Sequence, residues 1–413
     1  MSGESLRSHR VLPVAIIAAM GLGVFAGVVL GQHAVPLGVF GKLFVQLIKM
    51  MAIPLVFFSI VEALVVTLVS WKSAGRMLII VAINSCCALI IGLTLTNIVQ
   101  PGRGFAAPQT PRALVSAVES RPLDLNTVVN SIIPTSIVQP FVDNNVISVV
   151  LLSVLIGCAI RQYLTTAPTA DAIGKFERGI RGILSIWGIL LGWLVRLVPL
   201  AVFCVTARTV GEYGFAPFRG LVWYVGLAVC GLALHILLVY PIWIRFVAGF
   251  SLRRFISHAK HPVVYAFGTN SSLATLPVTL GELDAMGVPK SASRLGACIG
   301  TNLNNDGILL YEAMAVLFVA QAYGIEMSIG EQITAALISL AAAIGVAGIP
   351  EAGVVSLSLV LTAVGLPLEI VPMLLTVDWI IARMRSITNV LSDMTVSIGV
   401  SALEGARTRG ESC

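Results

Sequence analysis

Six long apolar runs, separated by short polar or charged stretches, occupy most of the first 250 residues of the chain. They lie near Val11–Gly31, Phe44–Val69, Met77–Val99, Val146–Ile160, Ile183–Thr206 and Leu221–Val247. A helix needs about 20 apolar residues to cross the hydrocarbon core of a bilayer. The fourth run is shorter than this, so we expect its helix to extend into the flanking residues. The pattern predicts six transmembrane helices.

The pattern changes after Ser251, where polar and small residues interrupt the apolar stretches. Two interruptions, Gly268–Pro277 and Gly345–Gly353, each lie between apolar segments that are too short to span a bilayer alone. Non-helical backbone at membrane depth survives only where it is buried in protein or lines a wet cavity. Paired broken segments of this kind point to the central site of a transporter. The alternative is that both are ordinary loops between helices.

We therefore expect an all-α integral membrane protein with about eight transmembrane helices and two re-entrant helical hairpins. Residues 1–250 would form the six N-terminal helices and residues 251–405 a core, followed by a polar tail at 406–413. The core would contain hairpin 1 (about 255–290), broken helix 7 (about 293–322), hairpin 2 (about 331–367) and helix 8 (about 370–403).

The composition agrees with a membrane protein, because 57% of the residues are hydrophobic and only 11% are charged, where about 25% charged is usual in soluble domains. A soluble fold needs polar groups to cover its surface, so an ordinary cytosolic enzyme, a disordered chain and a nucleic-acid binder are excluded. Basic residues precede the first apolar run and follow the second, fourth and sixth. This bias predicts a multi-pass protein of the cell membrane with its N-terminus in the cytoplasm.

Two further features of the sequence are less specific. Gly23, Gly27 and Gly31 form a tandem GxxxG pattern in the first run, which is typical of close packing against another helix or of a dimer face. The five histidines are scattered along the sequence, so we expect no metal cluster from them.

The last predicted helix carries polar side chains at membrane depth: Asp378, Arg383, Arg385, Asn389 and Asp393. At about 100° per residue, all except Arg383 fall within about 80° of one another. Each charge at the bilayer centre costs roughly 2.5–3.5 kcal/mol, so this stripe cannot face lipid. We expect Asp378 to pair with Arg385 and the stripe to face protein, ions or substrate. A purely structural ion-pair network is the alternative.

A second polar cluster, Gly300–Gly307, contains three asparagines and Asp306 in an apolar context. This composition predicts a helix that unwinds. Freed carbonyls together with carboxylate and amide oxygens suit a small hard cation such as Na⁺, and transition metals would require His or thiolate ligands. Asn84 and Ser85 in the third run are further candidate ligands.

The chain from about Val11 to Gly405 resembles the dicarboxylate/amino acid:cation symporter family, which contains the glutamate transporter homologues. The serine-rich stretch 271–277 resembles the tip of the family's first hairpin, and residues 347–353 resemble the tip of the second. Residues 304–308 stand where the family has Asn-Met-Asp-Gly-Thr, and residues 385–393 match Arg-Thr-x-x-Asn-x-x-x-Asp. The resemblance implies an inverted-repeat elevator transporter.

The resemblance also implies a homotrimer in the lipid bilayer, in which each subunit has a static scaffold and a moving transport domain. The third and sixth spans would join the transport domain, and hairpin 2 would act as the gate. Arg385 would bind the substrate's distal carboxylate with support from Asp378, since a guanidinium fits that group in a bidentate manner.

The positions of this sequence that match the family's other site positions imply further site residues. Those that would contact or line the substrate site are Ser386, Asn389, Arg383, Ser271, Ser272, Ile308, Ala382, Gly348, Ile349, Pro350 and Gly353. The implied sodium ligands are Asn304, Asp306, Asn389, Asp393, Ser85 and carbonyls near Gly300 and Ile344.

The chain departs from the family pattern at several positions. Ala382 stands where members that carry amino acids have an aspartate for the α-ammonium group, Ile308 replaces the motif threonine, and Asn305 replaces the motif methionine. Arg383 corresponds to an arginine that many prokaryotic members place on hairpin 1, where this chain has Asn270. We expect Arg383 to reach the tip of that hairpin.

These features predict a sodium-coupled secondary active symporter for a small anionic carboxylate, with a C4-dicarboxylate as the leading candidate. Altered coupling, with H⁺ in place of Na⁺, is possible because Asn305 lies beside the sodium ligands. An acidic or neutral amino acid:cation symporter and a transport-inactive relative are further alternatives. We do not expect an enzyme, because Ser271 and Ser272 have no histidine nearby in the sequence. Glu351 at the second tip is either a solvated gate residue or a selectivity residue.

Overall fold

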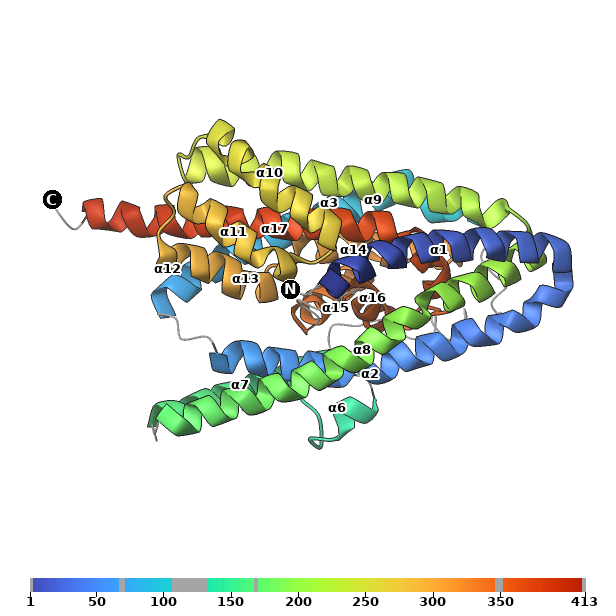
Figure 1. Ribbon diagram of the computed structural model, residues 1–413, viewed down its shortest axis with the longest axis horizontal. Helices are drawn as coiled ribbons and strands as arrows, with labels where there is room; N and C mark the ends of the chain where they lie inside the picture. The colour runs from blue at the N-terminus through green and yellow to red at the C-terminus, as the bar shows by residue number, and fades with distance from the viewer. Residues whose placement is uncertain are drawn as a thin grey trace.

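Helices form all the regular structure in the part of the chain that the computed structural model describes, which is residues 3–66, 71–105, 133–143, 145–166, 170–345 and 352–410 (Figure 1). The long N-terminal helices are α1 (Gly3–Leu30), α2 (Gly38–Val66), α3 (Trp71–Val99), α7 (Val146–Thr166), α8 (Ala170–Tyr213) and α9 (Ala216–Pro241). Each overlaps one predicted apolar run, and α7 extends beyond its run as expected. The short elements between them are η1 (Gly31–Leu37), η2 (Pro101–Gly104), α6 (Gln139–Val142) and the π-helical η3 (Ile242–Val247).

Four segments of the described residues are long and apolar enough to cross a membrane: Val14–Gly41, Gly75–Val99, Gly174–Glu212 and Gly220–Val247. Many large apolar side chains on the outer helices are exposed, with Phe25 at 69%, Val222 at 72% and Phe246 at 80%. A soluble protein rarely leaves such extended apolar surface in water. The exterior is therefore that of a protein in contact with lipid.

The first interruption forms a tight helical hairpin. α10 (Leu252–Thr269) ends at Asn270, which adopts a left-handed conformation with φ of 52°. α11 (Ser272–Ala285) then begins at Ser271, whose Oγ accepts a hydrogen bond from the backbone N–H of Ala274 at 3.2 Å. An asparagine C-cap followed by a serine N-cap reverses the chain within two residues.

The second interruption joins α15 (Ile329–Gly345) to α16 (Ala352–Ala363), and the intervening residues 346–351 lie outside the described part of the chain. The helix between the two hairpins is broken. Its first half comprises α12 (Lys290–Ser293), the π-helical η4 (Arg294–Ile299) and α13 (Gly300–Leu303), and its second half is α14 (Asp306–Ala322). The break itself consists of Asn304 and Asn305, which have non-helical backbone angles.

The last helix, α17 (Val371–Gly410), runs further than predicted and continues through the first part of the segment expected to be a polar tail. That segment lacks proline and contains alanine and arginine, which are strong helix formers. The backbone therefore has no reason to leave the helix before Gly410.

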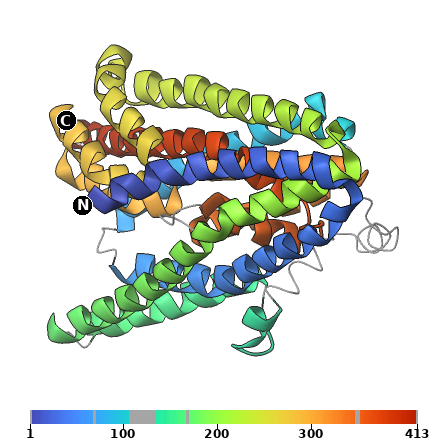
Figure 2. The same ribbon diagram turned by 45° about the vertical axis from the view of Figure 1, so that its right-hand side comes forward.

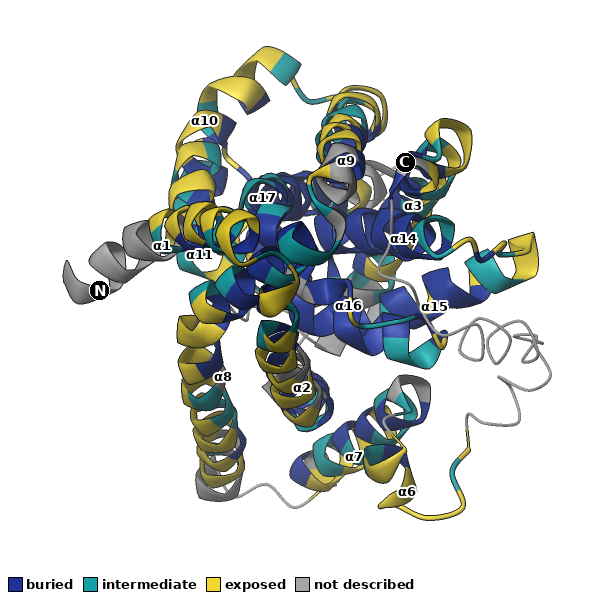
Figure 3. Ribbon diagram, turned by 90° about the vertical axis from the view of Figure 1, so that its right-hand side faces the viewer, coloured by how far each residue is buried: buried dark blue, intermediate teal, exposed yellow. Residues whose placement is uncertain are grey.

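α14 and α17 lie at the centre of the molecule, as the burial colouring in Figure 3 shows. Every residue of α14 from Asp306 to Ala320 is buried, which is typical of a helix surrounded by protein on all sides. α2, α7 and α8 lie on one side of this centre, and α9 and α10 lie on the other (Figures 1 and 2). The polar residues of the sequence motifs therefore fall on the two most enclosed helices.

The glycine pattern of α1 serves packing within the chain. Gly23 and Gly27 are buried, and a Cβ atom on either would collide with the backbone carbonyl of a residue of α8, Phe203 or Ala207. Close approach of two helix backbones is what small residues at this spacing permit. These two glycines are therefore occupied by α8 and do not form a dimer face.

Candidate functional site

Arg385 of α17 has a buried guanidinium group, which contacts one residue on its own helix and one on α14. Its Nη2 donates to Asp378 Oδ2 at 2.9 Å, so the ion pair expected from the helix spacing is present. Its guanidinium carbon lies 4.0 Å from the ring centroid of Tyr311 on α14, a cation–π distance. Arg385 is only 4% exposed, and a buried, oriented guanidinium of this kind can bind a carboxylate.

Hairpin 2 lies directly against this guanidinium. A Cβ atom added to Gly353, in the first turn of α16, would collide with the terminal atoms of Arg385. Asp378 and Tyr311 contact those atoms, so a methyl group at position 353 would have to displace the guanidinium from these partners. Gly353 and Arg385, which the sequence places 32 positions apart, are thus brought into contact.

The tip of hairpin 1 contacts α17, the helix that carries Arg385. Ser386 Oγ donates to Asn270 Oδ1 at 3.1 Å, and Thr301 Oγ1 of the broken helix donates to Ser272 Oγ at 3.2 Å. Arg383 lies over the ring of Phe267 on α10, at 5.9 Å from the ring centroid. Arg383 therefore reaches hairpin 1 close to its tip, as expected.

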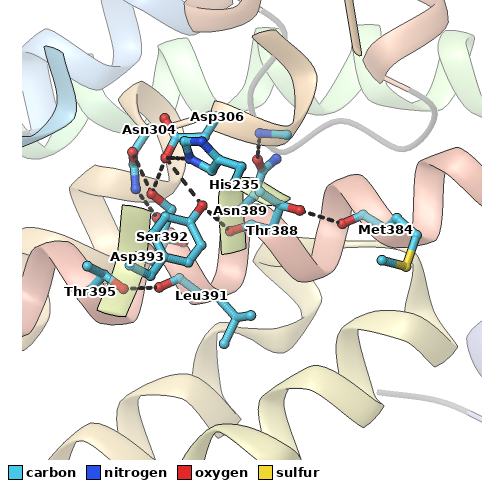
Figure 4. A network of polar contacts seen from close by, with 12 residues as sticks. His235, Asn304, Asp306, Met384, Thr388, Asn389, Leu391, Ser392, Asp393 and Thr395 are labelled. Carbon is cyan, nitrogen blue, oxygen red and sulfur yellow. Dashed lines mark hydrogen bonds and ion pairs between the residues drawn. The ribbon is translucent and has the colours of Figure 1, made fainter. Parts of the chain in front are cut away.

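The break between α13 and α14 and the C-terminal end of the polar stripe on α17 form one buried polar network (Figure 4). Ser392 Oγ lies 2.5 Å from Asp306 Oδ2 and 3.0 Å from Asn304 Oδ1. Asn304 Nδ2 donates to Asp393 Oδ1 at 3.3 Å. The two carboxylates that the sequence places 87 residues apart thus lie in one network through a serine and an asparagine.

Oxygen atoms in this network and on the neighbouring helix α3 are of the kind that binds a small hard cation. Asp306 Oδ1 makes no hydrogen bond with any described residue, and neither do the side chains of Asn84 and Ser85 on α3, a helix that packs against α14. Buried polar atoms without a partner need an explanation, and oxygen donors of this type bind alkali and alkaline-earth cations. Among the described residues, no three His, Cys, Asp or Glu side chains group as a metal site would require.

The other residues predicted for the site lie on α13, α14, α15 and α17 or outside the described residues. Ile308 and Ala382 are buried on α14 and α17, and a Cβ on Gly300 would lie 3.4 Å from Asp393 Oδ1. Ile344 lies in the last turn of α15. Gly348, Ile349, Pro350 and Glu351 lie outside the described residues.

The structure adds polar residues that the sequence reasoning missed. His235 Nε2 and Tyr240 Oη, both from α9, lie 3.4 Å and 3.3 Å from Asp306 Oδ2 (Figure 4 shows the histidine). Glu312 on α14 is fully buried, and serine hydroxyls of hairpin 2 lie beside its carboxyl group. Glu312 could have been identified from the sequence, because it is an acidic residue inside the apolar run that follows Asp306.

Two of the five histidines, which are scattered in the sequence, meet at one glutamate in hairpin 1. His258 and His261 of α10 place their Nδ1 atoms 2.7 Å and 2.6 Å from the two carboxyl oxygens of Glu282 on α11. The three residues cluster because the hairpin brings α11 back alongside α10, which no local sequence pattern reveals. The cluster ties the two arms of hairpin 1 together.

Comparison with known proteins identifies the family of this chain. The sequence profile of the sodium:dicarboxylate symporter family matches residues 12–403. The chain belongs to this family. It is also similar to a protein named C4-dicarboxylate transport protein from Bordetella avium (strain 197N), with 28% identity over 419 residues that cover 98% of this chain and 92% of that protein.

Membership of the sodium:dicarboxylate symporter family settles the class of the protein. Symporters are transporters, so the chain is a multi-pass membrane transport protein and not an enzyme. Motif residues that the structure describes on hairpin 1, the broken helix and α17 meet near Arg385 and Asp306.

Proposed function

We propose that this chain is a sodium-coupled secondary active symporter that imports a C4-dicarboxylate by an elevator mechanism. The observation that carries the proposal is Arg385, a buried guanidinium that is oriented by Asp378 and lies beneath hairpin 2. A guanidinium recognises a planar carboxylate through two parallel hydrogen bonds. The hairpin tips and Ser386 would hold the second carboxylate.

The preference for a substrate without an amino group rests on Ala382. This buried residue lies one helical turn before Arg385, and the nearby carboxylate of Asp378 is already paired with Arg385. An ammonium group in this position would be buried without an acidic partner, which costs several kcal/mol. The printed name of the relative from Bordetella avium, a C4-dicarboxylate transport protein, supports the same substrate class.

Sodium coupling is supported by the unpartnered buried oxygens of Asp306, Asn84 and Ser85 and by the family name. Their oxygen chemistry suits a hard cation, and a cation that completes this site only when substrate is bound would couple the two gradients.

For transport, we propose that the chain is divided into a static scaffold and a moving transport domain. Residues 1–250 would mostly form a static scaffold that trimerises, with α3 and α9 joining the moving domain, and residues 251–405 would form the transport core with hairpin 2 as its gate. The N-terminus would lie on the cytoplasmic side of the cell membrane, because the flanking Lys and Arg residues favour that orientation.

Proton coupling is the second candidate, and Glu312 is the observation that favours it. Its buried carboxyl group lies next to Ser339 and Ser356 of hairpin 2, where an ionised form would be costly. Glu312→Gln mimics the neutral acid. If Na⁺ alone drives transport, we expect the variant to retain sodium-driven uptake; loss of uptake that is driven by a pH gradient in the unmodified protein would favour proton coupling.

The substrate proposal is tested by competition for succinate binding to the purified protein. Malate and fumarate should compete at concentrations similar to succinate, and aspartate and glutamate should require at least about tenfold more, a difference of about 1.4 kcal/mol. The variant Ala382→Asp should reverse part of this preference. Equal competition by aspartate in the unmodified protein would contradict the proposal.

A further inference from the structure

Asn305, at the break between α13 and α14, connects this break to two other elements through its side chain. Its Nδ2 donates to the backbone carbonyl of Ala343 on α15 at 3.1 Å, and its Oδ1 accepts from Asn389 Nδ2 of α17 at 3.3 Å. Asn305 is only 2% exposed. The side chain therefore ties hairpin 2 and the last helix to the break.

The orientation of this amide is fixed by its partners. A carbonyl can only accept a hydrogen bond, so the NH₂ group of Asn305 must face Ala343. Asn389 is oriented in turn, because its Oδ1 accepts the backbone N–H of Gly307 at 2.9 Å and leaves its NH₂ group for Asn305. These partners fix the direction of donation in a series of three hydrogen bonds. The series starts at the N–H of Gly307, passes through Asn389 and Asn305, and ends at the carbonyl of Ala343.

The acceptor at the end of this chain is of the kind that attracts cations. Ala343 lies in the last turn of α15, which ends at Gly345, and the last four carbonyls of a helix have no partner within it. The C-terminal end of a helix also carries a partial negative charge. In transporters with discontinuous helices, such ends coordinate Na⁺.

We propose that the Asn305 amide takes the place of a bound cation at the C-terminal end of α15. Hairpin 2 then docks on the broken helix through a hydrogen bond that does not depend on the sodium concentration. This inference rests on the proposed sodium coupling and deepens it, because it lowers by one the number of sodium ions that accompany the substrate relative to a chain with a cation ligand at position 305.

The test replaces the NH₂ group of Asn305, a hydrogen-bond donor, by a carboxylate oxygen, which is an acceptor in a side chain of the same shape. In Asn305→Asp a carboxylate and the Ala343 carbonyl face each other, an arrangement that recruits a cation. We expect the slope of log Kd for succinate against log [Na⁺], with choline as the replacement cation, to become steeper by about one, because linkage makes this slope the number of ions bound with the substrate. An unchanged slope would overturn the proposal.

Asn305→Leu tests the hydrogen bond without adding a ligand. This variant should weaken succinate binding about tenfold at every sodium concentration with the slope of the unmodified protein. Asn97→Asp is the matched control, since Asn97 pairs with Gln332 at the other end of α15, on an exposed surface. Its slope should not change, and binding by Asn305→Leu equal to that of the unmodified protein would contradict the proposal.

A sodium-only measurement separates this inference from the proposed function. Without any substrate, Na⁺ should raise the thermal unfolding midpoint of Asn305→Asp more than that of the unmodified protein. If succinate binds neither protein, the substrate proposal fails, and the sodium-dependent midpoints still decide whether position 305 replaces a cation. Equal sodium-dependent shifts in the two proteins would overturn the inference.

Discussion

At the scale of single residues, the site is built on contacts that the sequence reveals only in part. The pairing of Asp378 with Arg385 follows from their separation of two helical turns, so it could be predicted. The contact of Arg385 with Tyr311 and the close approach of Gly353 could not, because they join three helices that only the tertiary fold brings together. Local periodicity predicts which face of a helix is polar and says nothing about what that face meets.

Arg385→Lys should lower the affinity for succinate by at least about tenfold, because a lysine is a point charge that cannot make two parallel hydrogen bonds or stack on Tyr311 in the same way. Isothermal titration of the purified protein measures this. Arg181→Lys is a suitable control, since Arg181 forms a partly exposed ion pair with Glu62 outside the site. Similar affinities of Arg385→Lys and the unmodified protein would show that the guanidinium does not bind substrate.

Gly353→Ala should displace the guanidinium of Arg385 and weaken succinate binding, because the added methyl group occupies the same space. The unfolding midpoint should change little, since a side-chain end can move at modest cost. Gly281→Ala is the control, because Gly281 has open space around its Cα. Binding by Gly353→Ala at unchanged affinity would mean that hairpin 2 does not rest on Arg385 in the substrate-bound protein.

At the scale of elements, the hydrophobic pattern predicted the six N-terminal helices and the two polar interruptions. The polar composition of residues 300–307 predicted an unwound helix, which the structure shows as a break at Asn304 and Asn305. Those features follow from local composition, because apolar length and clustered asparagines act within a few residues. The clusters around Glu282 and His235 could not be predicted in this way. Each joins helices whose relative rotation depends on packing, so the histidines appeared scattered in the sequence.

The cluster of His258, His261 and Glu282 predicts a pH-dependent contribution to hairpin 1. Hydrogen bonds from the two imidazoles, that of His261 first, lower the pKa of Glu282 from its ordinary value; the residue lies outside the apolar spans. A lowered carboxyl pKa stabilises the fold above the ordinary pKa of about 4.3, and this contribution disappears as the pH falls through the lowered value.

Glu282→Gln should therefore lower the unfolding midpoint at pH 6 to 7, by less than about 2 °C because the partners are partly exposed. The difference from the unmodified protein should start to decrease below about pH 4.3, the ordinary pKa of glutamate, and should vanish once the pH has fallen through the lowered pKa. Thermal unfolding in detergent across this range measures the effect. A difference that persists undiminished in acid would mean that the ionised carboxylate is not what ties the two arms together.

At the scale of the whole molecule, the polar residues of the last third of the sequence meet in the most enclosed part of the fold, around α14 and α17 (Figure 3). The outer helices surround this centre with apolar surface. Charges at such depth are tolerated only when they are paired or bind ligands, and the family to which the chain belongs couples sodium and dicarboxylate. Arg385 and Asp306 are the natural points at which the two would bind.

The central claim is that a sodium gradient drives uphill movement of a C4-dicarboxylate. Radiolabelled succinate uptake into proteoliposomes tests this directly, with sodium outside and choline inside. We predict accumulation above the external concentration that collapses when the sodium gradient is dissipated and that is absent in Arg385→Lys at low succinate. Accumulation that depends only on a pH gradient, or equilibration without accumulation under a sodium gradient, would contradict the account.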